Sequence, residues 1–462
     1  MAHIPLEIAD LILGNFTDET GSFNTSYQNK RTLASCALVC HSWRPFAQNR
    51  LFEELRLDIR FGRPLDQLLT FLESSPHIAA AIRDLYIYSY NPRSSLADDY
   101  EKSHPEDKRK EPQVSPVLLM KVAAQLSPRA HLRLETFTLL GWPSDTPLPA
   151  APVRLRVLAL CGLVYEPFLT PQTTYFDLTS LFDLDEIHFV GGRMRATTDV
   201  ARILDVLVLP VATRPVARSV HFLGSDCFAA CNLRCGGFDP GHLKSVVFSL
   251  RDIASLKLAS ALLRLQGGGI RDIDLKISYD VSNTEPGTGL WGTLDIAACT
   301  QLESLHLEWH HVGTRAYGAQ DQDLNACDSI AAVLASTPQT LRRLSFSLPY
   351  AQHPDALDEM LRCLAPRIDR AVDRFSELKT ITVKATRSFA AEECMNVVRG
   401  TLPTGLLDNG VLRIEHELFL FCWCNLIHLG LSVVAQRIAP NILTGFLTST
   451  LGASNRSRRR AP

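Results

Sequence analysis

The stretch that decides the fold is residues 302–307, which read Leu302-Glu303-Ser304-Leu305-His306-Leu307. Apolar residues stand at its first, fourth and sixth positions, and the last two alternate with a polar residue, as in a strand with one buried face. Most successive copies of this pattern are roughly 21 to 39 residues apart, a spacing typical of solenoid repeats. The other copies are Phe52/Leu55/Leu57, Ile82/Leu85/Ile87, Leu134/Phe137/Leu139, Leu155/Leu158/Leu160, Leu184/Ile187/Phe189, Ala217/Val220/Phe222, Leu243/Val246/Phe248, Ile270/Ile273/Leu275, Leu341/Leu344/Phe346 and Leu378/Ile381/Val383.

Several segments between these copies have the apolar spacing of amphipathic helices. A strand followed by a helix, repeated in this way, predicts a parallel α/β sheet, and no single repeat can bury its own apolar face without stacking on its neighbours. The alternative is a non-repeat α/β domain with buried parallel strands. The expected helices are Asp66 to Glu73, Val117 to Leu126, Asp199 to Leu207, Ser255 to Leu265, Ser329 to Leu334 and Leu357 to Leu364.

Together these features resemble an irregular leucine-rich repeat array that covers most of residues 52–383. The Asn or Cys that regular repeats place beyond the last Leu is mostly absent, and the repeat spacing drifts. The resemblance therefore implies alternating strands and helices rather than a regular horseshoe curvature.

The first fifty residues carry a second pattern, with apolar positions at helical spacing. Pro5 suits the first turn of a helix, where a missing N–H group has no cost. A polar segment, Asn15 to Arg31, is expected to be a loop before a second apolar stripe. Such stripes also occur in ordinary helical hairpins that pack on their own domain. The first face comprises Ile4, Ile8, Leu11 and Ile12, and the second Leu33, Cys36, Ala37 and Cys40, with Val39 and Trp43 adjoining it.

The order of Ile4-Pro5-Leu6-Glu7-Ile8, then Val39-Cys40-His41-Ser42-Trp43-Arg44, then Leu51-Phe52 resembles the F-box. The resemblance implies an all-helical unit that docks on a Skp-type adaptor. A few well-packed apolar side chains dominate the energy of such interfaces. The expected adaptor-binding residues are Ile4, Pro5, Ile8, Leu11, Ile12, Leu33, Val39, Cys40 and Trp43.

The order of these two regions is similar to that of fungal and other eukaryotic substrate receptors of SCF-type (Skp–cullin–F-box) ubiquitin ligases. We therefore expect an F-box-like domain at residues 1–53 and a leucine-rich-repeat-like solenoid at residues 54–416. The resemblance implies that a Skp-type adaptor and its cullin complex bind the first region, while a target protein binds the second. The alternatives are a scaffold outside the ubiquitin pathway and, less favoured, a nucleotide-binding enzyme.

Composition favours a folded protein without a general affinity for polyanions or lipid. The chain is 46% hydrophobic and 21% charged, with a formal net charge of −2 and a pI of about 6.7. We therefore expect neither nucleic acid nor a membrane as partner. Its 12 cysteines form no Cys-x-x-Cys pair, and no signal peptide is evident, so reduced thiols and a cytoplasmic or nuclear location are expected.

Two segments depart from the repeat. Residues 91–116 combine prolines with dense mixed charge, which predicts a disordered surface insertion. Residues 417–462 form an atypical C-terminal segment with a basic tail. Within it, residues 418–435 contain no Asp, Glu, Lys or Arg, which is at the lower limit for a membrane span, although a terminal cap or a gene-model error is favoured.

Three constellations could carry chemistry. Residues 287–292 match G-x-G-x-x-G, and Glu308 follows, but the preceding strand ends too early for dinucleotide binding. Cys227, Cys231 and Cys235 have an unusual spacing for zinc. Residues 308–311, Glu-Trp-His-His, are expected just past a strand, where adjacent histidines point to opposite sides. We therefore expect no enzyme, no cofactor and no metal.

Overall fold

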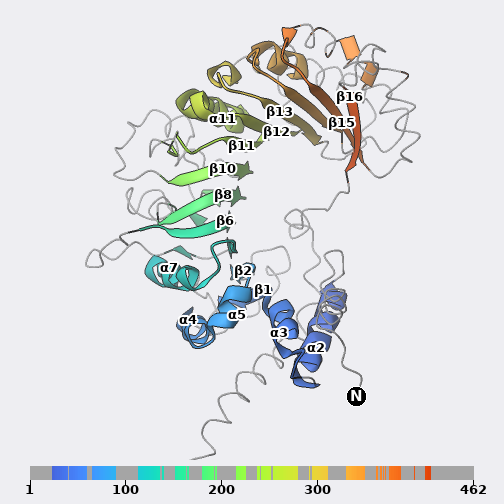
Figure 1. Ribbon diagram of the computed structural model, residues 1–462. Coiled ribbons are helices and arrows are strands. Elements are labelled where there is room, and N and C mark those ends of the chain that lie inside the picture. Colours follow the sequence, from blue (N-terminus) through green and yellow to red (C-terminus); the bar gives the residue numbers. More distant parts are fainter. Residues whose placement is uncertain are drawn as a thin grey trace, which may run out of the picture. The chain divides into compact units, whose positions relative to one another are not determined.

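The computed structural model shows an α/β protein built on a parallel sheet (Figure 1). The described residues belong to one compact unit, which comprises residues 1–90 and 110–418. The structure describes residues 23–39, 41–59, 65–89, 113–135, 138–139, 151–162, 164–165, 179, 181–191, 193–194, 215–224, 237–239, 241–250, 253–278, 291, 294–310, 329–348, 361–362, 365–366, 368, 370, 374–386, 400 and 412–417.

Twelve strands form one parallel sheet in which each pairs with the next of the twelve along the chain. The expected alternation of strands and helices is confirmed for part of the array, where helices at residues 65–74, 116–125, 253–266 and 329–336 lie between strands. The strands are β1 (Glu54–Asp58), β2 (Asp84–Tyr88), β4 (His131–Glu135), β6 (Val153–Cys161), β8 (Phe182–Val190), β10 (Val216–Leu223), β11 (Ser245–Leu250), β12 (Asp272–Ser278), β13 (Ser304–His310), β14 (Arg343–Leu348), β15 (Thr380–Thr386) and β16 (Leu412–Glu417). The longer helices are α2 (Phe23–Val39), α3 (Arg44–Phe52), α4 (Leu65–Ser74), α5 (Pro76–Ala81), α7 (Pro116–Gln125) and α11 (Ile253–Gln266).

The apolar positions of the repeat lie in one continuous core. Phe189, Phe222 and Phe248 occupy register positions on neighbouring strands, and their rings stack with centroids 5.3 and 5.7 Å apart. Helix α7 contacts β6 and α11 contacts β11, so these helices cover the apolar side of the strands. Each repeat thus buries its apolar residues against the next, as a stacked array requires.

The glycines that follow β6, β8 and β10 end these strands in the same way. Gly162, Gly191 and Gly224 have φ angles of 56°, 50° and 66°, a region that L-residues rarely adopt. The Gly162 and Gly191 N–H groups donate to the carbonyl groups of Val190 and Leu223 on the next strand. These glycines are a repeat feature that the apolar pattern alone did not identify.

Two strands differ from the sequence prediction. In both, the first position of the six-residue repeat, which is apolar in the other copies, holds a polar residue. In β4 the buried pair is Leu132 and Leu134, whereas the sequence prediction placed the strand at residues 134–139, and Arg129 holds the position that is apolar in the other copies. Residues 138–139 form instead the short strand β5 (Thr138–Leu139), which pairs with β3 (Gln113–Val114). Strand β16 was missed for the same reason, since Asn409 precedes it.

Other expectations need correction as well. The predicted loop Asn15 to Arg31 is wrong from Phe23 onward, because α2 begins there and packs against α3. The predicted insertion 91–116 is wrong at its end, where β3 and the start of α7 bury Val114 and Pro116. Glu308 to His310 lie within β13 and not past it.

Several predicted helices are present, and α5 was not expected. Helices α4, α7 and α11 match the predicted segments closely, and residues 329–336 are helical. Pro76 and Pro116 stand in the first turns of α5 and α7, where a missing N–H group has no cost. The predicted helix at 199–207 and most of the one at 357–364 lie outside the described residues.

Candidate functional site

The first candidate surface is the helical pair α2–α3, which has a small core of its own. Leu33 is 1% exposed and packs with the fully buried Ala47. Four partly buried residues surround them: Cys36, Ala37, Phe46 and Leu51. The second apolar stripe therefore holds the two helices together, and Leu33 in particular lies inside the pair.

Leu38 is the residue of this pair that sequence reasoning missed. Its exposed fraction is 77%, which is the larger of the two values for exposed large apolar side chains in the described chain. Most residues of the run Leu33-Ala34-Ser35-Cys36-Ala37-Leu38-Val39 are apolar, so the sequence alone does not show which of them is exposed. The structure shows that Leu33 is buried and that Leu38 is exposed. An exposed leucine next to a turn is a candidate anchor for a partner.

The other predicted adaptor-binding residues are only partly placed. Val39 ends α2, and Trp43 is half-buried in the turn before α3, with its carbonyl oxygen accepting a hydrogen bond from the Ala47 N–H at 2.9 Å. Ile4, Pro5, Ile8, Leu11, Ile12 and Cys40 lie outside the described residues.

The helical pair is joined to the first repeat. The Lys30 ammonium donates to the carbonyl oxygen of Glu54, at the start of β1, at 3.0 Å. Burial lowers the pKa of Lys30 below its usual value, because the charged form loses hydration. Phe52 packs against the main hydrophobic core, and its ring lies 6.0 Å from the Phe71 ring, measured between centroids. The pair is therefore continuous with the sheet in packing.

The second candidate surface is the sheet face opposite the apolar core, which we name the polar face. Because side chains alternate along a strand, every second residue of each strand lies on it. Neighbouring strands are in register, so these residues form a row that runs across the sheet. The central row is Arg56, Tyr86, Arg133, Ala159, His188, His221, Val247, Asp274, His306, Ser345 and Thr382.

An aromatic and charged cluster occupies the β1–β4 end of the polar face. The guanidinium groups of Arg56 and Arg133 lie 6.0 and 4.8 Å from the centroid of the Tyr86 ring. Tyr86 donates its hydroxyl proton to Glu135, and burial together with this carboxylate raises the pKa of Tyr86. Aromatic and arginine side chains of this kind are enriched at protein interfaces.

A histidine cluster lies in the middle of the polar face. The rings of His188 and His221 stack with centroids 4.0 Å apart, and Glu186 lies 3.0 Å from His188 Nε2. Burial and the neighbouring His188 lower the pKa of His221 to about 4, so its imidazole is neutral at pH 7. The hydrogen bond from His188 lowers the pKa of Glu186. Donor atoms of Glu186, His188 and His221 lie within 4.8 Å of one another.

A similar trio, Asp274, His306 and Glu308, lies on β12 and β13. Here a cation is already present, because the Lys276 ammonium is 3.1 Å from the Glu308 carboxylate, whose residue is 8% exposed. His306 Nδ1 is 2.5 Å from the Ser345 hydroxyl oxygen. This trio is therefore a partly buried polar group in which Glu308 and His306 already have neighbouring partners.

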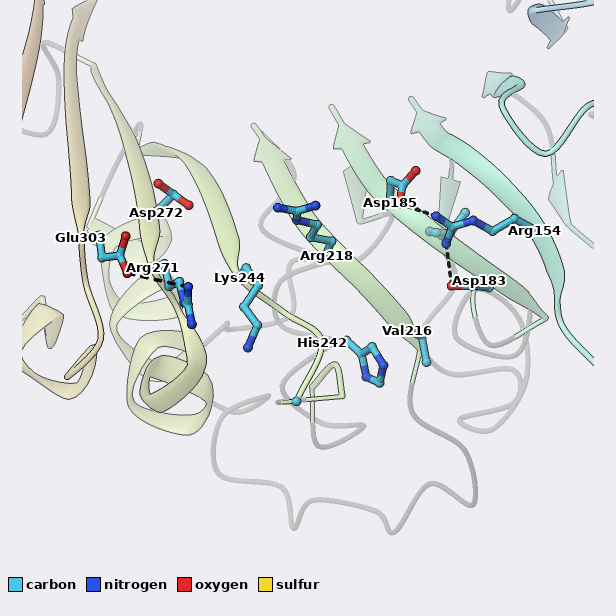
Figure 2. Close-up of a pocket in the computed structure, with 12 residues that line it drawn as sticks. Arg154, Asp183, Asp185, Val216, Arg218, His242, Lys244, Arg271, Asp272 and Glu303 are labelled. Atoms are coloured by element: carbon cyan, nitrogen blue, oxygen red, sulfur yellow. Dashed lines mark hydrogen bonds and ion pairs between the residues drawn. The ribbon is translucent and has the colours of Figure 1, made fainter. Parts of the chain in front are cut away.

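A pocket with a volume of about 600 Å³ lies at the N-terminal ends of β6 to β13 (Figure 2). Arg154 is held by Asp183 at 2.8 Å and also by Asp185, and Arg271 is 3.7 Å from Glu303. Two further cations of the lining, Arg218 and Lys244, form no ion pair with any residue that the structure describes. They are neighbours, since the Lys244 N–H donates to the Arg218 carbonyl at 2.8 Å.

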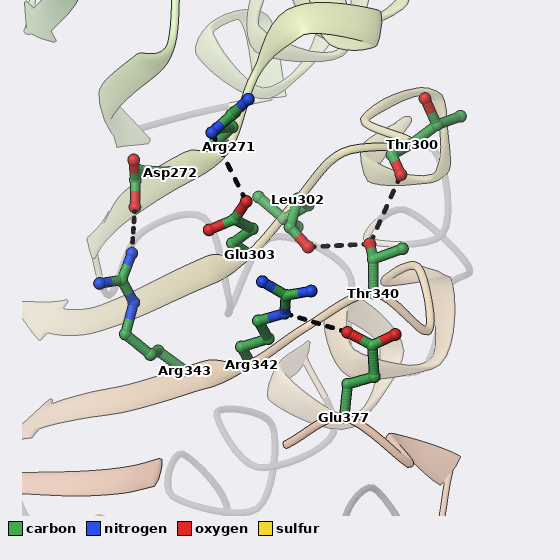
Figure 3. A network of polar contacts seen from close by, with 9 residues as sticks. All are labelled: Arg271, Asp272, Thr300, Leu302, Glu303, Thr340, Arg342, Arg343 and Glu377. Carbon is green, nitrogen blue, oxygen red and sulfur yellow. Dashed lines mark hydrogen bonds and ion pairs between the residues drawn. The ribbon is translucent and has the colours of Figure 1, made fainter. Parts of the chain in front are cut away.

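Beyond the pocket the same sheet edge carries paired charges (Figure 3). Arg343 reaches back to Asp272 at 3.0 Å, and Arg342 pairs with Glu377 at 3.0 Å. The Thr340 hydroxyl donates to the Leu302 carbonyl at 2.9 Å. These exposed pairs contribute little stability each, and they leave Arg218 and Lys244 as the available cations of the pocket.

The constellations singled out in the sequence lie mostly outside the described residues. This holds for the cysteines at 227–235, for the C-terminal segment 417–462 beyond Glu417, and for residues 287–292 except Trp291, which is buried. Among the helices that the structure describes, none is long and apolar enough to cross a membrane. His221, which flanks the cysteines in sequence, stacks on His188 instead.

Comparisons with known proteins give no family assignment. No protein-family model matches the chain, and no curated protein matches it.

Proposed function

We propose that this protein is the substrate-recognition subunit of an SCF-type ubiquitin ligase, with a Skp-type adaptor on the helical pair and a target protein on the sheet. The observation that carries the proposal is the joining of two unlike surfaces in one unit. One is a helical pair with an exposed leucine, and the other is a long parallel sheet with a charged face. A receptor subunit needs two such surfaces, because it brings a target to the ligase.

Adaptor binding is supported by the two different roles of apolar residues in the helical pair, some of which hold the helices together while Leu38 is exposed. Leu33 and Ala47 close the contact between α2 and α3, which fixes the direction in which Leu38 points. Anchors on a rigid helix lose little entropy when they bind. Leu38 thus joins Ile8 and Trp43, which the F-box resemblance assigns to the adaptor.

On the target side, the support is the length and chemistry of the polar face. Tyr86 with its two arginines, the histidine cluster and the pocket at Arg218 supply different polar groups along one surface. Extended repeat surfaces of this type bind partners over many shallow contacts. The cations of the pocket favour an acidic segment of the target.

The test is co-expression of the full chain with a Skp-type adaptor, followed by size-exclusion chromatography with light scattering. The account expects a complex with one copy of each protein, and its loss in the double variant Ile8→Asp, Trp43→Ala. Failure of the native, folded chain to bind the adaptor would leave a repeat scaffold outside the ubiquitin pathway as the better account.

A further inference from the structure

The histidine cluster contains more metal-ligand atoms than its hydrogen bonds use. His188 on β8 and His221 on β10 are register partners, and Glu186 lies two residues before His188 on the same face. Their donor atoms lie within 4.8 Å of one another. Two imidazoles and a carboxylate form a ligand set that zinc and neighbouring transition metals prefer.

A third imidazole lies beside this trio. The His131 ring on β4 is 6.4 Å from the His188 ring, measured between centroids, and meets it edge-on. Between them, β6 contributes only the small side chains of Val157 and Ala159. The space between β4 and β8 on the polar face is therefore bridged by the histidines.

The two nitrogens of His131 are in different environments. Nδ1 lies 3.1 Å from the Asp84 carboxylate, an arrangement that places the proton on Nδ1. Nε2 is buried and has no hydrogen-bond partner among the described residues. A carboxylate that orients a histidine whose other nitrogen remains available is the usual support of a metal-bound imidazole.

We propose that His131, Glu186, His188 and His221 bind one divalent transition-metal ion, with Zn²⁺ as the preferred ion, and that Asp84 positions His131. Ligand atoms of a tetrahedral zinc site are about 3.3 Å apart, given metal–ligand bonds of about 2.0 Å. The trio must contract slightly, and His131 must turn toward it, while His188 Nε2 exchanges Glu186 for the metal. These are side-chain rotations on strands that stay paired.

The surrounding charges distinguish this cluster from the second trio. At Asp274, His306 and Glu308, the Lys276 ammonium already contacts the Glu308 carboxylate, and its positive charge disfavours the binding of a metal ion there. The field of Lys276 also reaches His221, and that of Arg156 reaches Glu186. We therefore expect moderate rather than extreme affinity. Bound metal would tie β4, β8 and β10 together across the polar face, independently of any ubiquitin-ligase role.

The experiment uses the full chain without a polyhistidine tag, freed of metal by a chelator. Titration with Zn²⁺ is expected to show one equivalent bound and a rise in the melting temperature, because the ion binds the folded state. Co²⁺ is expected to give the visible absorption of a tetrahedral site without a thiolate band. Asp84→Asn is expected to lower the Zn²⁺ affinity by roughly 10- to 100-fold.

Three variants test whether the bound Zn²⁺ lies at the histidine cluster or at other residues of the chain. His188→Asn with His221→Asn is expected to abolish the first equivalent, whereas His242→Asn, at the pocket, leaves it unchanged. Glu186→Gln provides a milder variant if the double variant does not fold. Absence of binding to the native chain, a cobalt–thiolate band, binding that survives in the folded double histidine variant, or an unchanged Zn²⁺ affinity in Glu186→Gln would each overturn the proposal.

Discussion

His188 and His221 are register partners on β8 and β10, and their imidazole rings stack with centroids 4.0 Å apart. In a parallel repeat sheet, residues at the same position of successive repeats become neighbours, although they are far apart in the chain. The same rule stacks Phe189 on Phe222 on the opposite face. One register thus builds both the core and the polar face.

The phenylalanine ladder predicts a large loss of stability on truncation. Phe222 is 4% exposed and lies between Phe189 and Phe248. Phe222→Ala is expected to lower the free energy of unfolding by about 3–5 kcal/mol, because it removes buried apolar surface and leaves a cavity. Urea unfolding followed by circular dichroism measures this change. Leu265→Ala, at a position that is 46% exposed, is the control and should change it by less than about 0.5 kcal/mol.

The helical pair predicts opposite outcomes for two leucines of one helix. Leu33→Asp places a charge in the contact between α2 and α3 and is expected to unfold the pair. Leu38→Asp places the same charge in solvent and should leave the circular dichroism spectrum and melting temperature unchanged. Limited proteolysis around α2 provides the readout. Equal protease resistance of the two variants would contradict the assignment of Leu33 to the inside.

The buried thiols predict an order of chemical labelling. Burial raises the pKa of Cys299 to about 12, and Cys161 is 4% exposed, so both are poor nucleophiles in the folded protein. Cys36 is only partly buried and should react before these two cysteines with iodoacetamide. Peptide mass spectrometry at short reaction times measures the order, and labelling in urea is expected to remove the differences. Early modification of Cys299 would show that the η5 region (Ile296–Ala298) opens readily.

The pocket predicts a charge preference for the target. Arg218→Glu with Lys244→Glu reverses the charge of two neighbouring cations that lack carboxylate partners in the described chain. This variant is expected to lose targets with acidic segments in proximity labelling, because like charges in an interface repel. Lys257→Glu with Lys379→Glu, which changes two exposed lysines outside the pocket lining, is the matched control. If the native chain and the pocket variant label the same proteins, the pocket has no role in target binding.

The sequence predicted the sheet well because the repeat is a local pattern with a strong physical cause. For ten of the eleven predicted copies, such as those that begin at Leu302 and Leu341, the strand lies where the pattern places it. Arg129 and Asn409 break the pattern, and there the prediction shifted a strand or missed one. At these two strands, pairing with the neighbouring strand decides where the strand lies, and the residues of one segment do not show which strand it pairs with.

The sequence could not predict the polar clusters, because they depend on register across separated strands. His131, His188 and His221 are isolated histidines in the chain, and only strand pairing brings them together. Likewise, Leu33 and Leu38 lie in one apolar run, and the packing of α3 decides which is inside. The adaptor and target assignments remain predictions that rest on the F-box resemblance and on these surfaces.

The most direct test of the central claim is the affinity of the full chain for a Skp-type adaptor, measured by isothermal titration calorimetry. The account predicts a specific complex with the native chain, at least about a tenfold loss for Leu38→Asp, and no change for Leu265→Asp, which exposes a charge on α11. No binding by the native chain, or equal binding by Leu38→Asp, would contradict it.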